Sequence, residues 1–168
     1  MILEEDFYRQ ICQVMPIPCV DLIVEDALDR VLLLKRKNEP AKGEWWFPGG
    51  RINHGESRVE AAHRKLNEEC GMIAKNISVL YTLEILFDNC VPSFHALTTI
   101  IIMVIEKNKI ILDSQSSEGK WQSFKEWELS PLHPLLKTII KSVHTDRAAA
   151  ITPENLQGLL RYSSFSIK

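Results

Sequence analysis

Apolar residues recur along the chain at two spacings, one typical of helices and one typical of strands. Phe7, Ile11 and Val14 follow helical spacing between residues 4 and 14, which predicts a short amphipathic helix near the N-terminus. Residues 132 to 144 place six apolar side chains on one helical face. They are Leu132, Leu135, Leu136, Ile139, Ile140 and Val143. A second amphipathic helix is therefore predicted near the C-terminus.

Four segments are rich in apolar and β-branched residues, a pattern that favours strands. Residues 19–26 and 30–37 flank the short polar turn Ala27 to Asp29, which predicts a hairpin. Two longer strands are predicted at 77–88 and 96–107. The apolar run of the last one is continuous, so we expect it to lie at the centre of a sheet.

A glycine-rich loop precedes a third predicted helix. Four of the seven glycines fall between residues 43 and 55, which indicates a shaped loop rather than a linker. Ser57 and Glu60 form an S-x-x-E capping box, and Gly71 stands where a glycine commonly ends a helix. The helix is thus predicted over residues 58–70, packed against the sheet.

These elements predict an α+β fold in which a mixed β-sheet is sandwiched between α-helices. At 168 residues the chain is expected to form a single domain, residues 1–168, with an N-terminal helix and a C-terminal helical extension. Thr152, Pro153 and Glu154 are expected to open a last short helix of that extension. The polar stretch 113–122 is interpreted as a loop.

The composition excludes several classes of protein. Apolar residues make up 45% and charged residues 25% of the chain, with a net charge of −2, so no nucleic-acid partner is expected. No apolar run approaches the roughly 20 residues that span a bilayer, and the acidic N-terminus does not resemble a signal peptide. Cys12, Cys19, Cys70 and Cys90 form no C-x-x-C pair, so we expect reduced, packed thiols and a cytoplasmic location.

The predicted helix at 58–70 and the loop before it carry the candidate chemistry. A glycine such as Gly50 lets the backbone approach a ligand, so that its carbonyl can join the carboxylates of Glu68 and Glu69 around a hard cation. Arg51 can hold phosphate oxygens bidentately. The alternative is a solvated helix with ion pairs at four-residue spacing, each contributing about 0.2 to 0.5 kcal/mol.

The stretch from Gly50 to Met72, GRINHGESRVEAAHRKLNEECGM, resembles the Nudix box. It matches the pattern glycine, five residues, glutamate, seven residues, Arg-Glu-aliphatic-x-Glu-Glu-x-Gly-aliphatic at every defined position except Lys65. The resemblance implies the Nudix fold and hydrolysis of a nucleoside diphosphate linked to another group. It also implies that Glu56 and Arg64 brace the loop against the helix.

Within that superfamily, residues 18–71 are most similar to the GDP-mannose mannosyl hydrolase family, whose box also lacks the glutamate replaced by Lys65. This resemblance implies that water attacks the sugar carbon, that the products are nucleoside diphosphate and free sugar, and that the protein is a homodimer. It implies a Mg²⁺ cofactor, for which Mn²⁺ can substitute. The implied metal ligands are Gly50, Glu69 and Gln115, to which the general Nudix pattern, and not that of the mannosyl hydrolases, adds Glu68. The implied substrate-binding residues are Asp21, Arg36 and Arg51, of which Arg36 and Arg51 are also catalytic candidates.

Some of these residues have simpler interpretations. Asp21 could pair within its strand, Arg36 belongs to a basic run that could be a solvated turn, and Gln115 is one polar residue in a polar stretch. The aromatic residues 45–47 could stack on a base, but packing in the core is the better expectation for two of the three.

The sequence departs from the mannosyl hydrolase pattern at Ser116, where that family has a histidine general base. Serine is a poor base at neutral pH, so another group has to accept the proton. The candidates are Glu118, which we take as the catalytic one, and the histidines His54 and His95.

The leading hypothesis is therefore Mg²⁺-dependent hydrolysis of a nucleotide sugar to nucleoside diphosphate and sugar. One alternative is a conventional pyrophosphohydrolase that gives nucleoside monophosphate and sugar phosphate. The other is a Nudix-fold nucleotide-binding protein without catalysis, which Lys65 and Ser116 together make credible. Lys65 is predicted to pair with Glu69 or Glu68 at the edge of the site.

Overall fold

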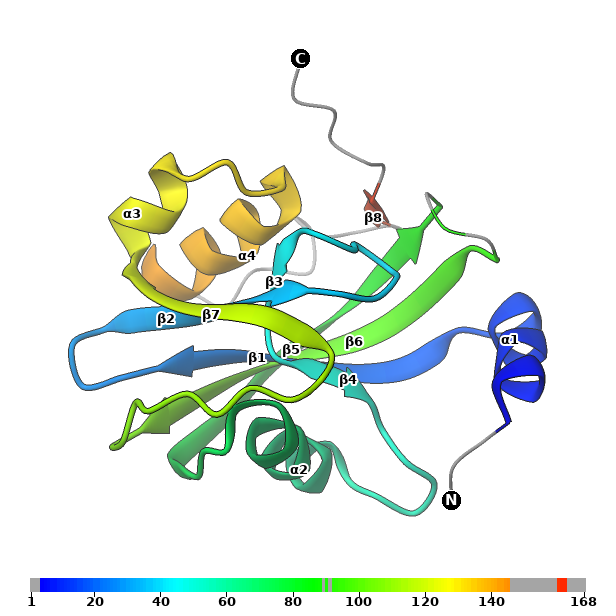
Figure 1. The fold of residues 1–168 in the computed structure, drawn as a ribbon, viewed down its shortest axis with the longest axis horizontal. Coiled ribbons are helices and arrows are strands. Elements are labelled where there is room, and N and C mark those ends of the chain that lie inside the picture. The colour runs from blue at the N-terminus through cyan, green and yellow to red at the C-terminus, as the bar shows by residue number, and fades with distance from the viewer. Residues whose placement is uncertain (1–3, 89, 91, 146–159, 163–168) are drawn as a thin grey trace.

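The computed structural model describes residues 4–88, 90, 92–145 and 160–162, which form one mixed sheet covered by helices (Figure 1). In chain order the elements are α1 (Glu5–Val14), β1 (Ile17–Glu25), β2 (Arg30–Arg36), β3 (Trp45–Trp46), β4 (Gly49–Arg51), α2 (Arg58–Cys70), β5 (Ala74–Phe87), β6 (Phe94–Ile105), β7 (Ser116–Ser123), α3 (Phe124–Leu129), α4 (Pro134–Thr145) and β8 (Leu160–Tyr162).

The sheet has the strand order β3-β2-β1-β6-β5-β8, with β4 paired to β1 and β7 paired to β2. The pairs β1–β6 and β5–β8 are parallel and the other pairs are antiparallel, so the sheet is mixed as predicted. Strand β6 lies between β1 and β5, and its continuous apolar run is buried there. The expected central strand is therefore confirmed.

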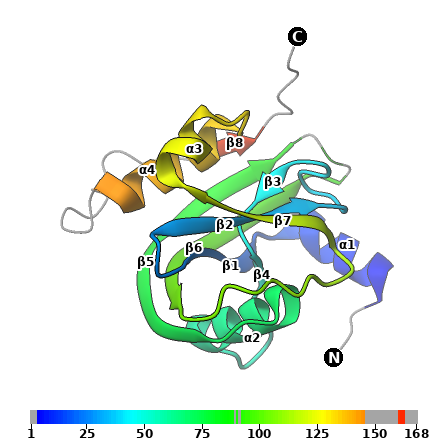
Figure 2. The same cartoon turned by 60° about the vertical axis from the view of Figure 1, so that its left-hand side comes forward.

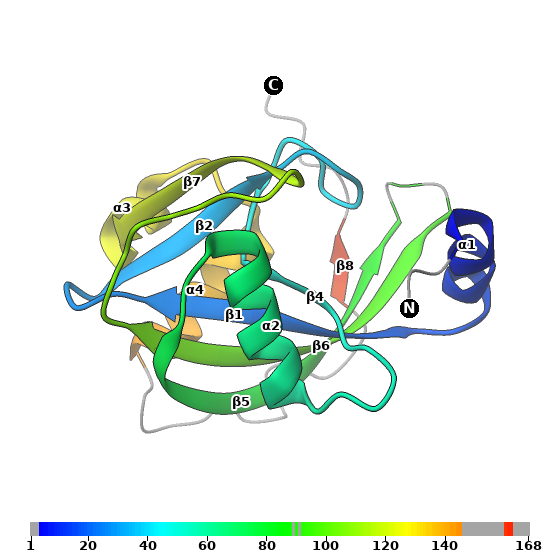
Figure 3. The same cartoon turned by 60° about the horizontal axis from the view of Figure 1, so that its bottom comes forward.

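Helices cover both faces of the sheet. Helix α2 packs on one face through Ala61, Ala62 and Leu66, whereas α3 and α4 pack on the other through residues such as Trp127 and Leu136. Figure 2 shows the two helical layers on opposite sides of the strands, and Figure 3 shows α2 in front of β1 and β6. The α+β sandwich predicted from the sequence is confirmed.

Helix α2 begins and ends where its sequence signals predict. The Ser57 hydroxyl accepts a hydrogen bond from the Glu60 amide at 3.2 Å, and the Glu60 carboxylate accepts one from the Ser57 amide at 2.8 Å. Gly71 ends the helix with a φ of 65°, in the left-handed region that favours glycine. These local caps hold the helix that carries the candidate chemistry at a defined place over the sheet.

Most of the other predicted elements are present, with two exceptions. The N-terminal helix, the hairpin with its turn at 26–29, the two long strands and the helix around 132–144 are all confirmed. The predicted loop at 113–122 is wrong for most of its length, because Ser116–Ser123 forms β7 and pairs antiparallel with β2. The predicted helix at residues 152–154 lies outside the described residues.

The four cysteines are free thiols, as expected; Cys19 and Cys70 are buried and the other two are half-buried. Among the residues that the structure describes, no helix combines the length and the apolar character needed to cross a membrane.

Candidate functional site

A cleft of about 890 Å³ opens between α1, the C-terminal half of α2 and the sheet, next to the glycine loop. Its charged lining includes the carboxyl groups of Asp21 and Glu69 and the cations of Arg36, Arg51 and Lys65. Its apolar lining includes Trp46, Ile85, Phe87 and Phe94. A smaller cavity of about 230 Å³ lies against Phe124 and His144 and shares no residue with the glycine loop or α2. The larger cleft is therefore the candidate site.

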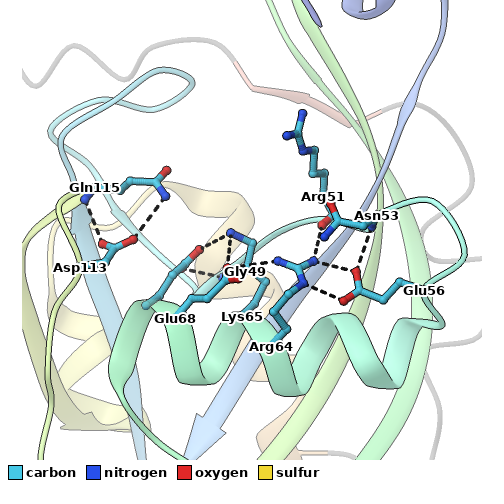
Figure 4. A network of polar contacts seen from close by, with 10 residues as sticks. Gly49, Arg51, Asn53, Glu56, Arg64, Lys65, Glu68, Asp113 and Gln115 are labelled. Atoms are coloured by element: carbon cyan, nitrogen blue, oxygen red, sulfur yellow. Dashed lines mark hydrogen bonds and ion pairs between the residues drawn. The ribbon is translucent and has the colours of Figure 1, made fainter. Parts of the chain in front are cut away.

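Beside the cleft, Glu56 and Arg64 form a two-point ion pair. Arg64 Nε donates to Glu56 Oε1 and Arg64 Nη2 donates to Glu56 Oε2, each at 2.7 Å (Figure 4). Arg64 Nη2 also donates to the Arg51 carbonyl at 3.1 Å, and Glu56 accepts from the Asn53 amide at 2.9 Å. We call the Glu56–Arg64 pair the brace, because it ties the loop to the middle of α2. The Nudix resemblance implied such a contact between loop and helix.

The hydrogen bonds from Arg64 are the main reason that the pKa of Glu56 lies below its ordinary value. The same hydrogen bonds, with Glu56 as the partner, raise the pKa of Arg64. Both groups therefore stay charged at neutral pH, and the brace is stabilised by its own charges.

Next to Arg64 in α2, Lys65 lies between two carboxylates. Its Nζ donates to Glu69 Oε1 at 3.1 Å and lies 3.5 Å from Glu68 Oε2. Glu69 Oε2 accepts a hydrogen bond from the Gly49 amide at 3.0 Å. The Lys65 and Glu69 side chains are each only 12% exposed, whereas Glu68 is 49% exposed. The pairing predicted for Lys65 is thus present with both glutamates.

Two of the acids that line the cleft, Asp21 and Glu69, carry protons more readily than free carboxylates. Burial raises the pKa of Asp21 to about 6, although the positive charge of Arg36 opposes the rise. Burial also raises the pKa of Glu69, although Lys65 opposes it. We call Asp21 and Glu69 the cleft acids, and their protonation is sensitive to pH near neutrality or below it.

Close backbone packing explains the two glycines of the loop. Gly49 and Gly50 in β4 pair with Asp21 and Val20 in β1. A Cβ on Gly49 would lie 2.2 Å from the Val20 carbonyl oxygen, and a Cβ on Gly50 would lie 2.8 Å from Lys65 Cε. Only glycine fits where this loop passes between β1 and the lysine side chain.

Both predicted arginines reach the cleft from different elements. Arg36, at the end of β2, donates from Nε to the Pro40 carbonyl at 2.7 Å, which leaves its terminal nitrogens for other acceptors. The Arg51 guanidinium lies 4.7 Å from the ring centroid of Tyr8, a cation–π contact with α1. Tyr8 was not predicted from the sequence as a site residue. The only sign of its role was an aromatic side chain with a polar end on the short amphipathic helix.

The predicted residues of the polar stretch are only partly brought together. Gln115 and Ser116 line the cleft. The Gln115 side chain donates to Asp113 Oδ2 at 3.3 Å, and the Asp113 charge contributes to the raised pKa of Glu69 (Figure 4). Asp113 was not predicted, although an acid two residues before Gln115 was a visible signal.

The three candidate bases do not line the cleft. Glu118 is exposed in β7, opposite Lys35 of β2. His54 is exposed in the loop before α2, and His95 is half-buried in β6. Among the described acids and histidines, those that line the cleft are Asp21, Glu39 and Glu69.

The predicted ligands have the right chemistry for magnesium, since carboxylate, carbonyl and amide oxygens are the donors that this hard cation prefers. Their arrangement does not fit it. Both Glu69 oxygens accept hydrogen bonds, from Lys65 and Gly49, and Lys65 also pairs with Glu68. Within the described part of the chain, no group of three or more Asp, Glu, His or Cys side chains could hold a metal ion. The ammonium of Lys65 occupies the space between the carboxylates.

Comparison with protein families matches residues 15–143 to the model of the NUDIX domain. Among curated proteins, the chain is 32% identical over 122 residues to the low-salt glycan biosynthesis protein Agl8 of Haloferax volcanii, covering 70% of this chain and 78% of Agl8. It is 39% identical over 80 residues to an ADP-ribose pyrophosphatase of Methanocaldococcus jannaschii, covering 48% of this chain and 47% of that protein.

Two solved structures share the fold. The NUDIX domain of Shewanella oneidensis NrtR, complexed with ADP ribose, superposes with a TM-score of 0.66 at 22% identity, covering 85% of this chain and 98% of that one. The MutT protein of Methanosarcina mazei superposes with a TM-score of 0.67 at 18% identity, covering 81% and 99%.

Proposed function

The chain belongs to the NUDIX family, and on that premise we propose that it hydrolyses a nucleoside diphosphate sugar similar to GDP-mannose, releasing nucleoside diphosphate and free sugar. The observation that carries the proposal is the content of one cleft. Arg36, Arg51 and Lys65 line it together with the two cleft acids and an aromatic wall.

Each part of the cleft suits one part of such a substrate. The positive charges of Arg36, Arg51 and Lys65 complement the negative charge of a diphosphate. The planar guanidinium groups of Arg36 and Arg51 can each hold phosphate oxygens at two points. Phe87 packs between Trp46 and Phe94, with ring centroids 5.4 and 5.9 Å apart. This wall offers an apolar surface to a base or a sugar ring.

The curated relatives support a sugar-linked nucleotide. Agl8, which matches this chain over most of both lengths, is a glycan biosynthesis protein. The ADP-ribose pyrophosphatase, which matches under half of each chain, acts on a nucleoside diphosphate joined to a sugar. The first name concerns glycan synthesis and the second a nucleoside diphosphate joined to a sugar, and a nucleotide-sugar substrate is compatible with both.

In the proposed reaction, water adds to the anomeric carbon while the bond from that carbon to the diphosphate oxygen breaks. The bonding electrons leave with the diphosphate, and the cations of Arg36 and Arg51 neutralise the charge that develops there. The proton released by water needs an acceptor in the cleft. Asp21, with a pKa of about 6, is the carboxyl group suited to accept it near neutral pH.

Attack at phosphorus is the second candidate function. The presence of both Glu68 and Glu69 at the end of α2 follows the general Nudix pattern and favours it. The products would then be nucleoside monophosphate and sugar phosphate. Nudix hydrolases generally use divalent metals such as Mg²⁺, so both reactions are to be assayed with Mg²⁺ and with EDTA.

Incubation with GDP-mannose or ADP-ribose in oxygen-18 water, followed by mass spectrometry, tests the proposal. We expect the label in the free sugar. Label in a nucleoside monophosphate or a sugar phosphate would replace the proposal by the second candidate. Tight nucleotide binding without turnover of either substrate would instead identify a binding protein.

Changing Glu69 to Gln is expected to lower turnover by about 100-fold, since it alters the charge at the centre of the cleft. Glu106→Gln is the matched control, because Glu106 is exposed and pairs only with Lys75 among the ion pairs of the described residues. Equal turnover by both variants would contradict a role for Glu69.

The homodimer implied by the resemblance stays a prediction, which analytical ultracentrifugation checks.

A further inference from the structure

The ammonium of Lys65 has the surroundings of a bound cation rather than of a surface lysine. Its Nζ lies 3.1 Å from Glu69 and 3.5 Å from Glu68, and its stem lies against the backbone of Gly50. Gly50, Glu68 and Glu69 are three of the four metal ligands that the sequence predicts. The side chain is 12% exposed and it lines the cleft.

We propose that Lys65 is a tethered cation that takes the place of a divalent metal in the box and binds the substrate's diphosphate directly. The first half of this inference is that the Lys65 ammonium takes the place of the metal. The second half rests on the proposed function, because it needs a diphosphate in the cleft.

Charge and donor geometry support the first half. Glu68 and Glu69 alone would present two negative charges, which suit a divalent ion, but Lys65 pairs with both of them and Arg64 also donates to Glu68 at 3.1 Å. A divalent ion entering between the carboxylates would meet a positive charge a few ångströms away. It could bind only after the Lys65 side chain had moved, which costs both the ion pairs and the packing against Gly50.

A comparison within the chain shows that this is no ordinary surface pair. Lys75 pairs with Glu106 at 2.7 Å, but those side chains are 60% and 66% exposed. Water screens such a pair, so it contributes little. The Lys65–Glu69 pair lies where screening is weaker, and its position on the cleft lets the charge act on a bound ligand.

The ammonium also has capacity left for a phosphate. An ammonium carries three donor hydrogens, and Glu69 accepts one of them in a hydrogen bond. Another hydrogen can therefore reach a phosphate oxygen in the cleft, which the cations of Arg36 and Arg51 also line. The chain thus provides three cations of its own for the diphosphate.

Manganese binding, followed by the paramagnetic resonance signal of free Mn²⁺, tests the first half without any nucleotide. We expect Lys65→Gln to bind Mn²⁺ about tenfold more tightly than the wild type, and Lys65→Glu, which adds a carboxylate, more tightly still. Lys65→Arg keeps the charge and is expected to bind as weakly as the wild type. Lys75→Gln, which removes one exposed positive charge, is the matched control.

Wild-type protein that binds Mn²⁺ as tightly as Lys65→Gln would overturn the inference. Circular dichroism spectra confirm that each variant is folded. Should Lys65→Glu fail to fold, the comparison of the Gln and Arg variants still decides, because only the charge at position 65 distinguishes their expected results.

Calorimetric titration with GDP in EDTA tests the second half. The wild type is expected to bind GDP without metal, and Lys65→Gln to bind it about tenfold more weakly, with part of the loss restored in a second titration in which Mn²⁺ replaces EDTA. Equal metal-free binding by both proteins would overturn direct diphosphate binding. If neither binds GDP while the Mn²⁺ results are as expected, the proposed function fails and the cation replacement stands.

Discussion

The carboxyl group of the brace and those of the cleft acids belong to one site, yet their surroundings shift their pKa values in opposite directions. Glu56 of the brace is held by two hydrogen bonds from Arg64, and its pKa is lowered. Asp21 and Glu69 are buried in the cleft, and burial raises the pKa of each. A bidentate partner stabilises the first charge, whereas loss of water destabilises the other two.

The difference separates what these residues do for the protein. The brace contributes to stability, because each of its charges is satisfied by the other. Ionised cleft acids lower stability, because Arg36 and Lys65 compensate only in part for their burial. Such costly groups are typical of functional sites, so we interpret the brace as structural and the cleft acids as functional.

The largest effect is expected for Asp21→Asn. The folded-state pKa of about 6 lies above the ordinary value of 3.8, so the contribution of Asp21 is fully present below pH 3.8 and is lost as pH rises through 6. At pH 8 the variant should be on the order of 3 kcal/mol more stable than the wild type, and this difference should vanish near pH 4.

Urea denaturation of both proteins from pH 4 to 8 measures this difference, and turnover of the folded variant is expected to fall. Parallel stability profiles for the two proteins would show that Asp21 is not a costly buried acid. Full activity in the variant would remove it from the proposed mechanism.

A smaller effect of opposite sign is expected for Glu56→Gln. The substitution removes the charged partner of Arg64 and should destabilise the protein by about 2 kcal/mol at pH 7. The pKa of Glu56 is lowered, so its contribution is present above the ordinary value of 4.5 and is lost as pH falls through the folded-state pKa. The gap between variant and wild type should therefore narrow in acid.

Chemical denaturation at pH 7 and at pH 3.5 checks that sign. An unchanged gap at the two pH values would mean that packing of Glu56, and not its charge, holds the loop. A combined Arg64→Ala and Glu56→Gln cycle then gives the coupling of the two side chains.

The smallest effect is expected for Ser57→Ala, which removes the side chain that caps α2. A loss of about 1 kcal/mol in unfolding free energy is typical for such a cap. Turnover by the folded protein should not change, because Ser57 lies outside the residues that line the cleft. Thermal unfolding measures the loss, and Ser57→Thr, which keeps a hydroxyl, is the control; equal melting of the Ala variant and the wild type would contradict the capping role.

The elements that were predicted correctly are those specified by neighbours in the sequence. The capping box and Gly71 delimit α2, and the alternation of apolar residues marks the long strands. β7 was missed because its residues are mostly polar; they form a strand only through pairing with β2, whose partner residues are 80 or more positions away in the chain. Long-range pairing leaves no local pattern in the sequence.

The residues of the candidate site also divide into those specified by a local sequence pattern and those that approach from distant segments. Its polar groups within residues 49–70 were all found, since the Nudix pattern is a local one. Tyr8 and Asp113 were missed, because they approach the site from distant segments. Glu118 was predicted as a candidate base, but it is exposed in β7, beyond a register shift that separates it from Ser116, and it does not line the cleft.

The sequence by itself determined the family, the α+β class, the ends of α2 and the presence of a lysine beside two glutamates. Only the tertiary structure decided what that lysine does, because α2 can place Lys65 next to Glu69 without specifying what lies on its other side. Packing of β4 against α2 brings Gly50 to the lysine stem, and the fold of α1 and β1 around the same point forms the cleft. Burial there reduces screening by water, which strengthens the interaction between the Lys65 charge and the carboxylate of Glu69.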